Sequence, residues 1–313
     1  MGGLLFLDTY GILDIENLLL SGVVMKKFTV FFTLLCLLLC ILSGCSHEQP
    51  QIVATTLPIY EFTSTICSGT NLQVGQLITE NVSCLHDYTL KVSQMRMIES
   101  AEVIVINGAG LEDFLEDPLA TSQQTIDSST GCHTHDADHH AHEHDHIHTE
   151  DPHIWLSPEN AKVMASNICI GLSDTYPEYA DIFASNLSDI IADLDALQAY
   201  GEDVLRDLPC RELITFHDGF AYFAESFDLT ILKAVEEESG SEASAQELKH
   251  LIMLVNDHHL PAVFTERNGS ISAANVICAE TNADVFQLNM AITGESYFTA
   301  MYHNIDTIKE ALG

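Results

Sequence analysis

The sequence predicts an α/β fold in which two parallel-sheet lobes are joined by one long rigid helix. Short apolar runs typical of buried strands alternate with segments of helical spacing from residue 52 onward. One long helical segment, 177–208, interrupts this alternation, which then resumes to the end of the chain. Since short strands separated by helices imply parallel βαβ units, each half of the alternation is expected to form its own lobe.

Within each lobe, strands and helices are expected in turn. The strand at 103–106 is followed by Asn107-Gly108, a turn signal, and the helix at 244–257 carries an apolar stripe. The expected strands are 52–55, 72–78, 103–106, 213–216, 230–235, 262–266 and 284–288, and the expected helices are 59–66, 92–100, 244–257, 271–280 and a last one around 298–308.

The connecting segment 177–208 repeats apolar residues at helical spacing. Pro177 suits the first turn of a helix, and Pro209 suits a position just past its end. At 1.5 Å per residue the helix would be about 45 Å long, enough to cross a small domain. This length favours a spacer between a first lobe at 52–176 and a second at 209–313 over an ordinary core helix.

Residues 1–44 are predicted to be a signal peptide, with Met25 as the true start because the preceding residues contain no lysine or arginine. Two lysines precede an almost unbroken apolar run, which ends in Leu-Ser-Gly-Cys at Cys45. This ending resembles the bacterial lipobox, in which a peptidase cuts before the cysteine and lipid is attached to it. A membrane anchor is the alternative, but the run is shorter than the roughly 20 residues that span a bilayer. We therefore expect a lipoprotein held on the outer face of the membrane through Cys45, with a polar tether at 46–51.

The chain is strongly acidic. Acidic residues outnumber basic ones 46 to 11, which gives a formal net charge of -35. Such a surface repels nucleic acid and anionic lipid, and it raises the local concentration of cations. The charge therefore disfavours a nucleic-acid partner, although most of these carboxylates are expected only to keep an exported protein soluble.

Six of the nine cysteines remain once the signal peptide is removed and Cys45 carries lipid. They show no C-x-x-C spacing, so a structural zinc knuckle is not expected. Export permits disulfides, but the sequence alone does not pair them. The six are Cys67, Cys84, Cys132, Cys169, Cys210 and Cys278.

Half of the 16 histidines fall in one stretch, 133–148, where carboxylates are interleaved with them. Such a segment cannot build a core, so a solvated loop is expected. Its side chains can bind Zn²⁺, Ni²⁺ or Cu²⁺ in many equivalent arrangements with modest affinity. We interpret this His-rich loop as a low-affinity metal collector or sensor, because an expression tag would lie at a terminus. Its histidines are His133, His135, His139, His140, His142, His144, His146 and His148.

Three other histidines lie in ordered-looking sequence. His86 follows the second strand, His153 follows the His-rich loop, and His217 lies at the carboxyl end of a strand. Ligand sites of parallel α/β sheets gather at those carboxyl ends. Three neutral imidazoles make a good ligand set for Zn²⁺ at about 2.0–2.1 Å each. Each histidine alone is as consistent with a surface or core position, but their common placement beside Asp, Gly or Pro favours a metal site.

Three motifs resemble those of zinc solute-binding lipoproteins of ABC importers: HDYTL from His86, DPHIWLSP from Asp151 and FHDGFAYFAESFDL from Phe216. This is the ZnuA/AdcA type of the TroA-like family, also called cluster A-I. The resemblance runs from about Ile52 to Leu312 and includes the position of the His-rich loop. It implies a metal ion held in the cleft between the lobes. It also implies a non-enzymatic, extracytoplasmic receptor that delivers Zn²⁺ to the permease and ATPase of an importer.

By this resemblance the metal ligands are His86 and His153 from the first lobe and His217 from the second. Manganese-binding members of the family generally have Glu in place of His217, and imidazole suits zinc better than added carboxylate does. Zinc is therefore favoured over manganese or another divalent cation. The family often has Asp or Glu at the fourth position, where this chain has Asn289, a weak neutral ligand. Asn289, a water, Glu266 and a histidine of the loop all remain candidates.

Two other classes of function remain open from the sequence. A zinc hydrolase can also use three histidines and a water, with Asp87 or Asp218 as general base. Each of these aspartates directly follows a predicted ligand, which equally suits an orienting role, and no hydrolase signature such as H-E-x-x-H is present. A metal-buffering adhesin built on the His-rich loop is the other class, but the ordered histidine trio argues against buffering alone.

Overall fold

The fold is described from a computed structural model. Residues Gln49–Gly313 form one compact unit. The predicted signal peptide, the lipid site at Cys45, His86 and the loop histidines from His139 to His148 lie outside the described residues. The structure describes residues 49–80, 82, 85, 88–115, 124–135, 151–236, 243–267 and 269–313.

The first lobe is built on a four-stranded sheet of order β2-β1-β3-β4, in which every pair of neighbours is parallel. The two central strands consist almost entirely of Ile, Val and Ala because side chains on both faces are buried. The strands are β1 (Ile52–Ala54), β2 (Val74–Gln76), β3 (Val103–Ile106) and β4 (Gln124–Asp127), and the helices are α2 (Leu57–Ile66), α3 (Val92–Ser100) and α5 (Pro158–Thr175), with short 3₁₀ turns η1 (Asp113–Leu115) and η2 (Ile154–Leu156).

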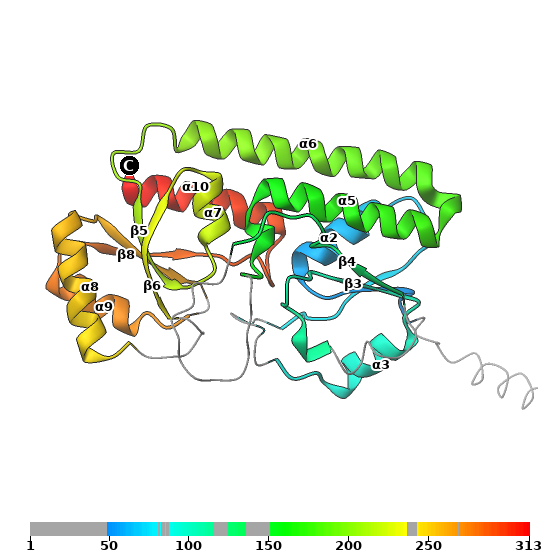
Figure 1. The fold of residues 1–313 in the computed structure, drawn as a ribbon, viewed down its shortest axis with the longest axis horizontal. Helices are drawn as coiled ribbons and strands as arrows, with labels where there is room; N and C mark the ends of the chain where they lie inside the picture. Colours follow the sequence, from blue (N-terminus) through cyan, green and yellow to red (C-terminus); the bar gives the residue numbers. More distant parts are fainter. Residues whose placement is uncertain are drawn as a thin grey trace, which may run out of the picture. The chain divides into compact units, whose positions relative to one another are not determined.

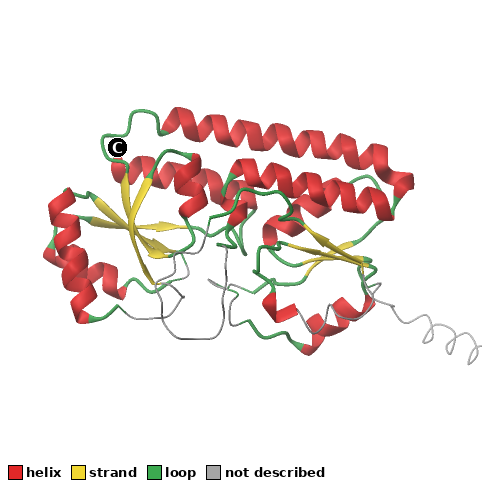
Figure 2. Cartoon of the chain, in the orientation of Figure 1, coloured by secondary structure: helices red, strands yellow, loops and turns green. Residues whose placement is uncertain are grey.

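The second lobe repeats this plan with a parallel sheet of order β6-β5-β7-β8. One face of its sheet packs on α8 and α9 through a separate apolar cluster that includes Phe216, Leu251 and Ile277. Figure 2 shows the two sheets and their helices. The strands are β5 (Glu212–His217), β6 (Thr230–Glu236), β7 (Ala262–Glu266) and β8 (Asp284–Leu288), and the helices are α7 (Ala221–Ser226), α8 (Ala245–His258), α9 (Ser272–Glu280) and α10 (Tyr297–Leu312).

The helix between the lobes is α6 (Ala180–Val204), which runs along both lobes in Figure 1. It packs on α2 and α5 of the first lobe and on α10 of the second. It is shorter than the predicted 177–208, because Pro177–Tyr179 form a separate 3₁₀ turn and Leu205 caps the last turn. Two parallel α/β lobes joined by one long helix confirm the predicted fold class.

Two elements of the first lobe were not predicted. The 18-residue helix α5 buries small and polar residues such as Asn160, Ala161 and Ala165, which weaken the apolar periodicity that marks a helix. Strand β4 lies at the edge of its sheet and buries only Ile126. Its sequence therefore lacks the apolar run of the central strands.

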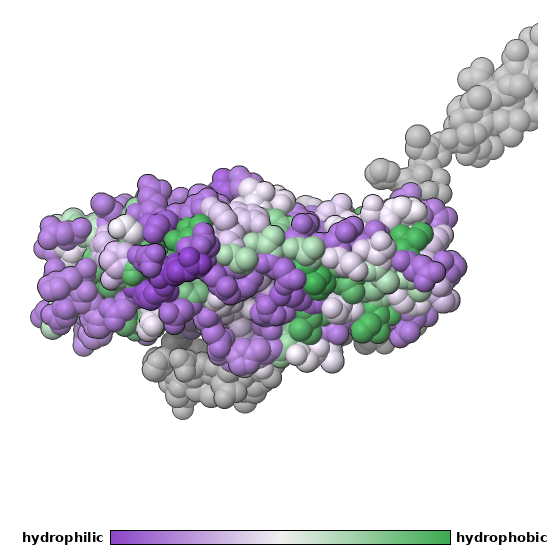
Figure 3. Space-filling view, turned by 90° about the horizontal axis from the view of Figure 1, so that it is seen from above, coloured by the Kyte–Doolittle hydropathy of each residue, from purple (hydrophilic) through white to green (hydrophobic). Residues whose placement is uncertain are grey.

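The surface on the α6 side carries mainly hydrophilic side chains, with hydrophobic ones in small groups (Figure 3). Single exposed apolar residues such as Ile182 and Tyr200 are common on the surface of a folded domain. Within the described ranges, no helix is both long and apolar enough to cross a membrane. The five described cysteines of the predicted mature chain are all free thiols: Cys67, Cys132, Cys169, Cys210 and Cys278.

Candidate metal centre

The carboxyl edge of the second sheet brings three predicted site residues together. His217 is the last residue of β5, Glu266 is the last residue of β7, and Asn289 directly follows β8. The parallel register pairs Thr215 with Phe264 and Glu266 with Leu288, so the three strands end side by side. This is the edge at which parallel sheets place their ligand sites.

His217 is buried, with only 1% of its side chain exposed, and it faces a carboxylate. Its Nδ1 lies 2.8 Å from Oε1 of Glu266, which is itself buried. The two groups are close without being aligned as a hydrogen bond. A carboxylate at this place favours the proton on Nδ1 and leaves the lone pair on Nε2.

His153 has the same arrangement in the first lobe. It lies at the start of the turn η2 and is almost fully buried. One oxygen of Asp151 accepts hydrogen bonds from the backbone N–H of His153 at 3.0 Å and from its Nδ1 at 2.7 Å. Burial alone would raise the pKa of Asp151, but the charge of His153 and these hydrogen bonds outweigh burial and lower it. Asp151 therefore stays ionised and orients the ring.

The two rings meet with their Nε2 atoms facing each other. Nε2 of His153 lies 3.2 Å from Nε2 of His217, and the ring planes are at 89°. Two nitrogens bound to one tetrahedral Zn²⁺ at about 2.0–2.1 Å each would lie roughly 3.3 Å apart. The pair is therefore spaced as two ligands of one small cation.

A buried acid that the sequence analysis did not single out fixes the first-lobe side of the site. Glu112 accepts hydrogen bonds from Thr55 Oγ1 at 2.6 Å and from the N–H groups of Asn107 and Gly108 at 2.7 and 3.0 Å. Burial raises the pKa of Glu112 to about 7 against these hydrogen bonds, which lower it. The side chain of Asn107 in turn donates to the carbonyl of Pro152 at 3.1 Å, which positions the residue before His153. The turn predicted after β3, at Asn107-Gly108, was the only sequence feature that pointed to this part of the site.

Hydrogen bonds between the lobes hold the other side of His153. Trp155, which is fully buried, donates from Nε1 to the carbonyl of Met290 at 2.7 Å. Tyr297 of α10 donates to the carbonyl of Trp155 at 2.9 Å. The ring of Trp155 also lies against His153, with centroids 5.3 Å apart. The relative position of the two histidines is thus set by the packing between the lobes.

Asn289 is buried at this edge, and its polar groups are engaged locally. Its Oδ1 accepts from the N–H of Ala291 at 2.9 Å. Its backbone N–H and carbonyl both bond to the side chain of Asn304, at 2.7 Å each. An amide oxygen can accept a second bond, and the N–H of Ala291 is its one donor among the residues that the structure describes.

The described structure brings together two of the three histidines predicted as ligands, His153 and His217, and places Asn289 at the same sheet edge. Glu266 contacts Nδ1 of His217 instead of offering its Oε1 to a shared cation. His133 and His135 of the His-rich loop lie against Glu225 of α7. The assignment of ligands, with His86 as the third, stays a prediction.

The chain is similar to known metal-binding proteins. The family model described as zinc-uptake complex component A, periplasmic (ZnuA), matches residues 52–311. A putative metal-binding protein of Treponema pallidum is 29% identical over 86% of this chain and 89% of its own length. The zinc-binding lipoprotein AdcA of Streptococcus pneumoniae is 28% identical over 91% of this chain, and the match spans only 61% of AdcA.

The fold has relatives among solved structures. A crystal structure of ZnuA superposes with a TM-score of 0.75 at 29% sequence identity. The superposition covers 84% of this chain and 100% of the other. The long helix and the paired lobes are therefore shared along almost the whole described chain.

Proposed function

Because the chain belongs to the family of zinc-uptake complex component A, we propose that it captures Zn²⁺ outside the cell and delivers it to an ABC-type zinc importer. Members of this family are non-enzymatic solute-binding proteins. The chain is accordingly a metal-binding receptor of an ABC importer and not a hydrolase. The metal ion is its cargo.

The 3.2 Å approach of the two Nε2 atoms carries this proposal. With carboxylates at both Nδ1 positions, each Nε2 presents a lone pair to the other. Two nitrogens at this distance match the spacing of two ligands on one tetrahedral Zn²⁺ ion. A Zn²⁺ ion bound to both would bridge the lobes at this point.

Nitrogen ligands support zinc rather than manganese as the cargo. The carboxylates of Asp151 and Glu266 lie at the far side of each ring, so the rings and not the carboxylates face the shared position. Imidazole suits zinc, whereas manganese prefers carboxylate, carbonyl and water oxygens. His86, assigned by its motif, would add a third nitrogen.

We propose that Asn289 or a water molecule is the fourth ligand of the metal ion. Glu266 is the poorer candidate because its Oε1 already contacts His217. The described histidines of the loop, His133 and His135, contact Glu225 instead. Within the described part of the chain, Oδ1 of Asn289 accepts one hydrogen bond, from Ala291, and an amide oxygen can accept a second partner such as a metal ion.

A site shared between two lobes suits a receptor that must also release its cargo. His153 belongs to the first lobe and His217 ends a strand of the second. A shift of one lobe against the other would separate the two nitrogens and open the coordination shell of the metal ion. A lipid anchor at Cys45 would keep the receptor beside its permease.

Metal analysis of the purified protein, followed by Zn²⁺ titration with Mn²⁺ as competitor, tests this function. One tight Zn²⁺ equivalent is expected, and a hundredfold excess of Mn²⁺ should fail to displace it, in keeping with the ligand preference of the two ions. Displacement of Zn²⁺ by equimolar Mn²⁺ would contradict the zinc assignment. The lack of any tight equivalent would contradict the receptor itself.

A further inference from the structure

We propose that Asn304 of α10 is a positioning residue for the metal centre, because it fixes the backbone of Asn289 and thereby the contact between the lobes at Trp155. The side chain of Asn304 is fully buried. Its Oδ1 accepts from the N–H of Asn289, and its Nδ2 donates to the carbonyl of the same residue, at 2.7 Å each. This inference rests on the proposed function and selects Asn289 over a water molecule as the fourth ligand.

The two hydrogen bonds of Asn304 replace the pairing that a neighbouring strand would give. Asn289 directly follows β8, where the backbone leaves its ladder with β7. Backbone N–H and carbonyl groups that are buried need partners, and the sheet no longer provides them at this residue. One side-chain amide satisfies both groups. The orientation of the Asn289 backbone is thereby set, and with it the direction in which its side chain leaves.

The residues after Asn289 form a turn of uncommon backbone geometry. Ala291 is fully buried and has a φ of 54°, in the left-handed region that favours glycine. Its N–H donates to Oδ1 of Asn289 at 2.9 Å, which closes the turn. Such a conformation persists only where the surrounding contacts enforce it. The bonds from Asn304 are among these contacts, since they hold the residue at which the turn begins.

This turn places Met290 between the surroundings of both site histidines. Its carbonyl accepts from Nε1 of Trp155 at 2.7 Å, and the ring of Trp155 lies against His153. On the second lobe, a Cβ atom added to Gly219 would lie 2.6 Å from Cδ2 of His217 and 2.8 Å from Cε of Met290. The side chains of Met290 and His217 thus border the same small space. A shift of the backbone at Asn289 would reach both rings through Met290.

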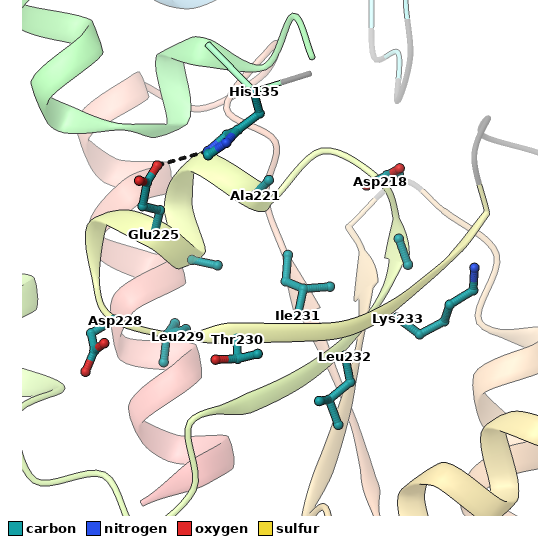
Figure 4. A pocket seen from close by; sticks show the side chains of 12 residues that line it. His135, Asp218, Ala221, Glu225, Asp228, Leu229, Thr230, Ile231, Leu232 and Lys233 are labelled. Carbon is teal, nitrogen blue, oxygen red and sulfur yellow. Dashed lines mark ion pairs between the residues drawn. The ribbon is translucent and has the colours of Figure 1, made fainter. Parts of the chain in front are cut away.

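Zn²⁺ titration against a competing chelator tests the effect on the tight site. The chelator excludes the weak sites expected in the His-rich loop, whose His135 is directed at Glu225 of α7 (Figure 4). Asn304→Ala should weaken the tight equivalent about tenfold or more, the scale of loss when a group that orients a metal ligand is removed. A water molecule in the space left by the amide can bond to the backbone of Asn289, so the fold is expected to persist.

Asn186→Ala on α6 is the matched control for the loss of a side-chain amide. The amide of Asn186 also makes two hydrogen bonds to the backbone, to the carbonyls of Ile66 and Ser68 at 2.9 and 2.8 Å. None of these three residues contributes to the metal centre described above. This variant should therefore bind Zn²⁺ as the wild type does.

Trp155 supplies a second readout that needs no metal. It is the single tryptophan of the chain, and its Nε1 bonds to the carbonyl of Met290. The emission of a buried indole moves to longer wavelength when water reaches the ring. In the zinc-free protein, Asn304→Ala should accordingly shift the emission to the red, whereas Asn186→Ala should leave it in place.

The outcomes separate this inference from the proposed function. In an Asn289→Ala background, Asn304→Ala should cost less zinc affinity than in the wild type, because the ligand that it positions is gone. An unchanged tight equivalent in Asn304→Ala, or equal losses in both backgrounds, would overturn the inference. If the wild type binds no tight Zn²⁺ while Asn304→Ala still shifts the emission of Trp155, the proposed function fails and the role of Asn304 at the lobe contact stands.

Discussion

Asp151 and Glu266 each lie at Nδ1 of a site histidine, at 2.7 and 2.8 Å. At the scale of single residues, these two carboxylates favour the proton on Nδ1, so that Nε2 of each ring faces the other ring. They come from different lobes, yet they act on the rings in the same way. Such partners of metal-bound histidines commonly change metal affinity by 10- to 100-fold when removed.

Glu266→Gln is expected to weaken Zn²⁺ binding about tenfold or more, because the ring of His217 loses its orienting charge. In a His217→Ala background the same change should cost little, since Glu266 acts through that ring. Zinc titration of the four proteins of this double-mutant cycle measures the coupling. Equal losses in both backgrounds would instead make Glu266 a metal ligand.

Asn289→Asp is expected to tighten Zn²⁺ binding by at least about tenfold, or roughly 1.4 kcal/mol. The added carboxylate keeps one oxygen for the N–H of Ala291 and places a charge beside the ion in a buried setting. Asn275→Asp on the exposed side of α9 is the matched control for added charge. An unchanged dissociation constant in Asn289→Asp would exclude this residue from the metal shell.

At the scale of helices and strands, the ends of strands position the site and the packing of helices holds the strands. Helix α6 holds the second lobe by apolar contacts and also by a close approach of its backbone to Phe227. Gly201, buried near its carboxyl end, leaves no room for a side chain: a Cβ atom there would lie 2.1 Å from the ring of Phe227. Phe227, which directly follows α7 and precedes β6, thus lies against the connecting helix.

Gly201→Ala is expected to lower the free energy of unfolding by about 1 kcal/mol, although alanine favours a helix. Overpacking against Phe227 costs about 1–3 kcal/mol, and the gain in helix propensity is only about 0.5–1 kcal/mol. Urea unfolding measures the difference. In a Phe227→Leu background the loss should shrink, and a Gly201→Ala protein more stable than the wild type would contradict this packing.

Strands and helices could be predicted from the sequence where their buried residues form a regular apolar pattern. Strands β3, β7 and β8 and helix α3 have the bounds expected from their apolar patterns. Helix α5 escaped because small and polar residues line its buried face, and β4 escaped because an edge strand buries only Ile126. Of the site, the histidines were predictable from motifs, whereas Glu112 and Glu225 act through contacts with residues distant in sequence.

At the scale of the whole molecule, the two lobes form one unit that meets at the histidine pair. Trp155, Tyr297 and Tyr222 bridge the lobes by hydrogen bonds on either side of His153. The first lobe also contains a buried acid, Glu112. Among the described residues, no basic side chain contributes to its pKa shift. Its ionisation affects the stability of the whole unit.

Glu112 should make the zinc-free protein less stable as pH rises from about 4.5 through 7. Burial raises the pKa of Glu112 from 4.5 to about 7, so in this range the folded protein binds a proton that the unfolded chain has released. The free energy of unfolding then falls with pH, by up to roughly 3 kcal/mol. Urea unfolding across this range should show that this part of the pH dependence is absent in Glu112→Gln. The same slope in both proteins would contradict the raised pKa.

The central claim is that His153 and His217 share one Zn²⁺ ion between the lobes, and Zn²⁺ titration of single alanine variants tests it most directly. His153→Ala and His217→Ala should each weaken the tight equivalent at least about hundredfold, or roughly 2.7 kcal/mol, because each removes one of the paired nitrogens. His303→Ala, at an exposed position on α10, should bind as the wild type does. Undiminished tight binding in His153→Ala and His217→Ala would contradict the shared site.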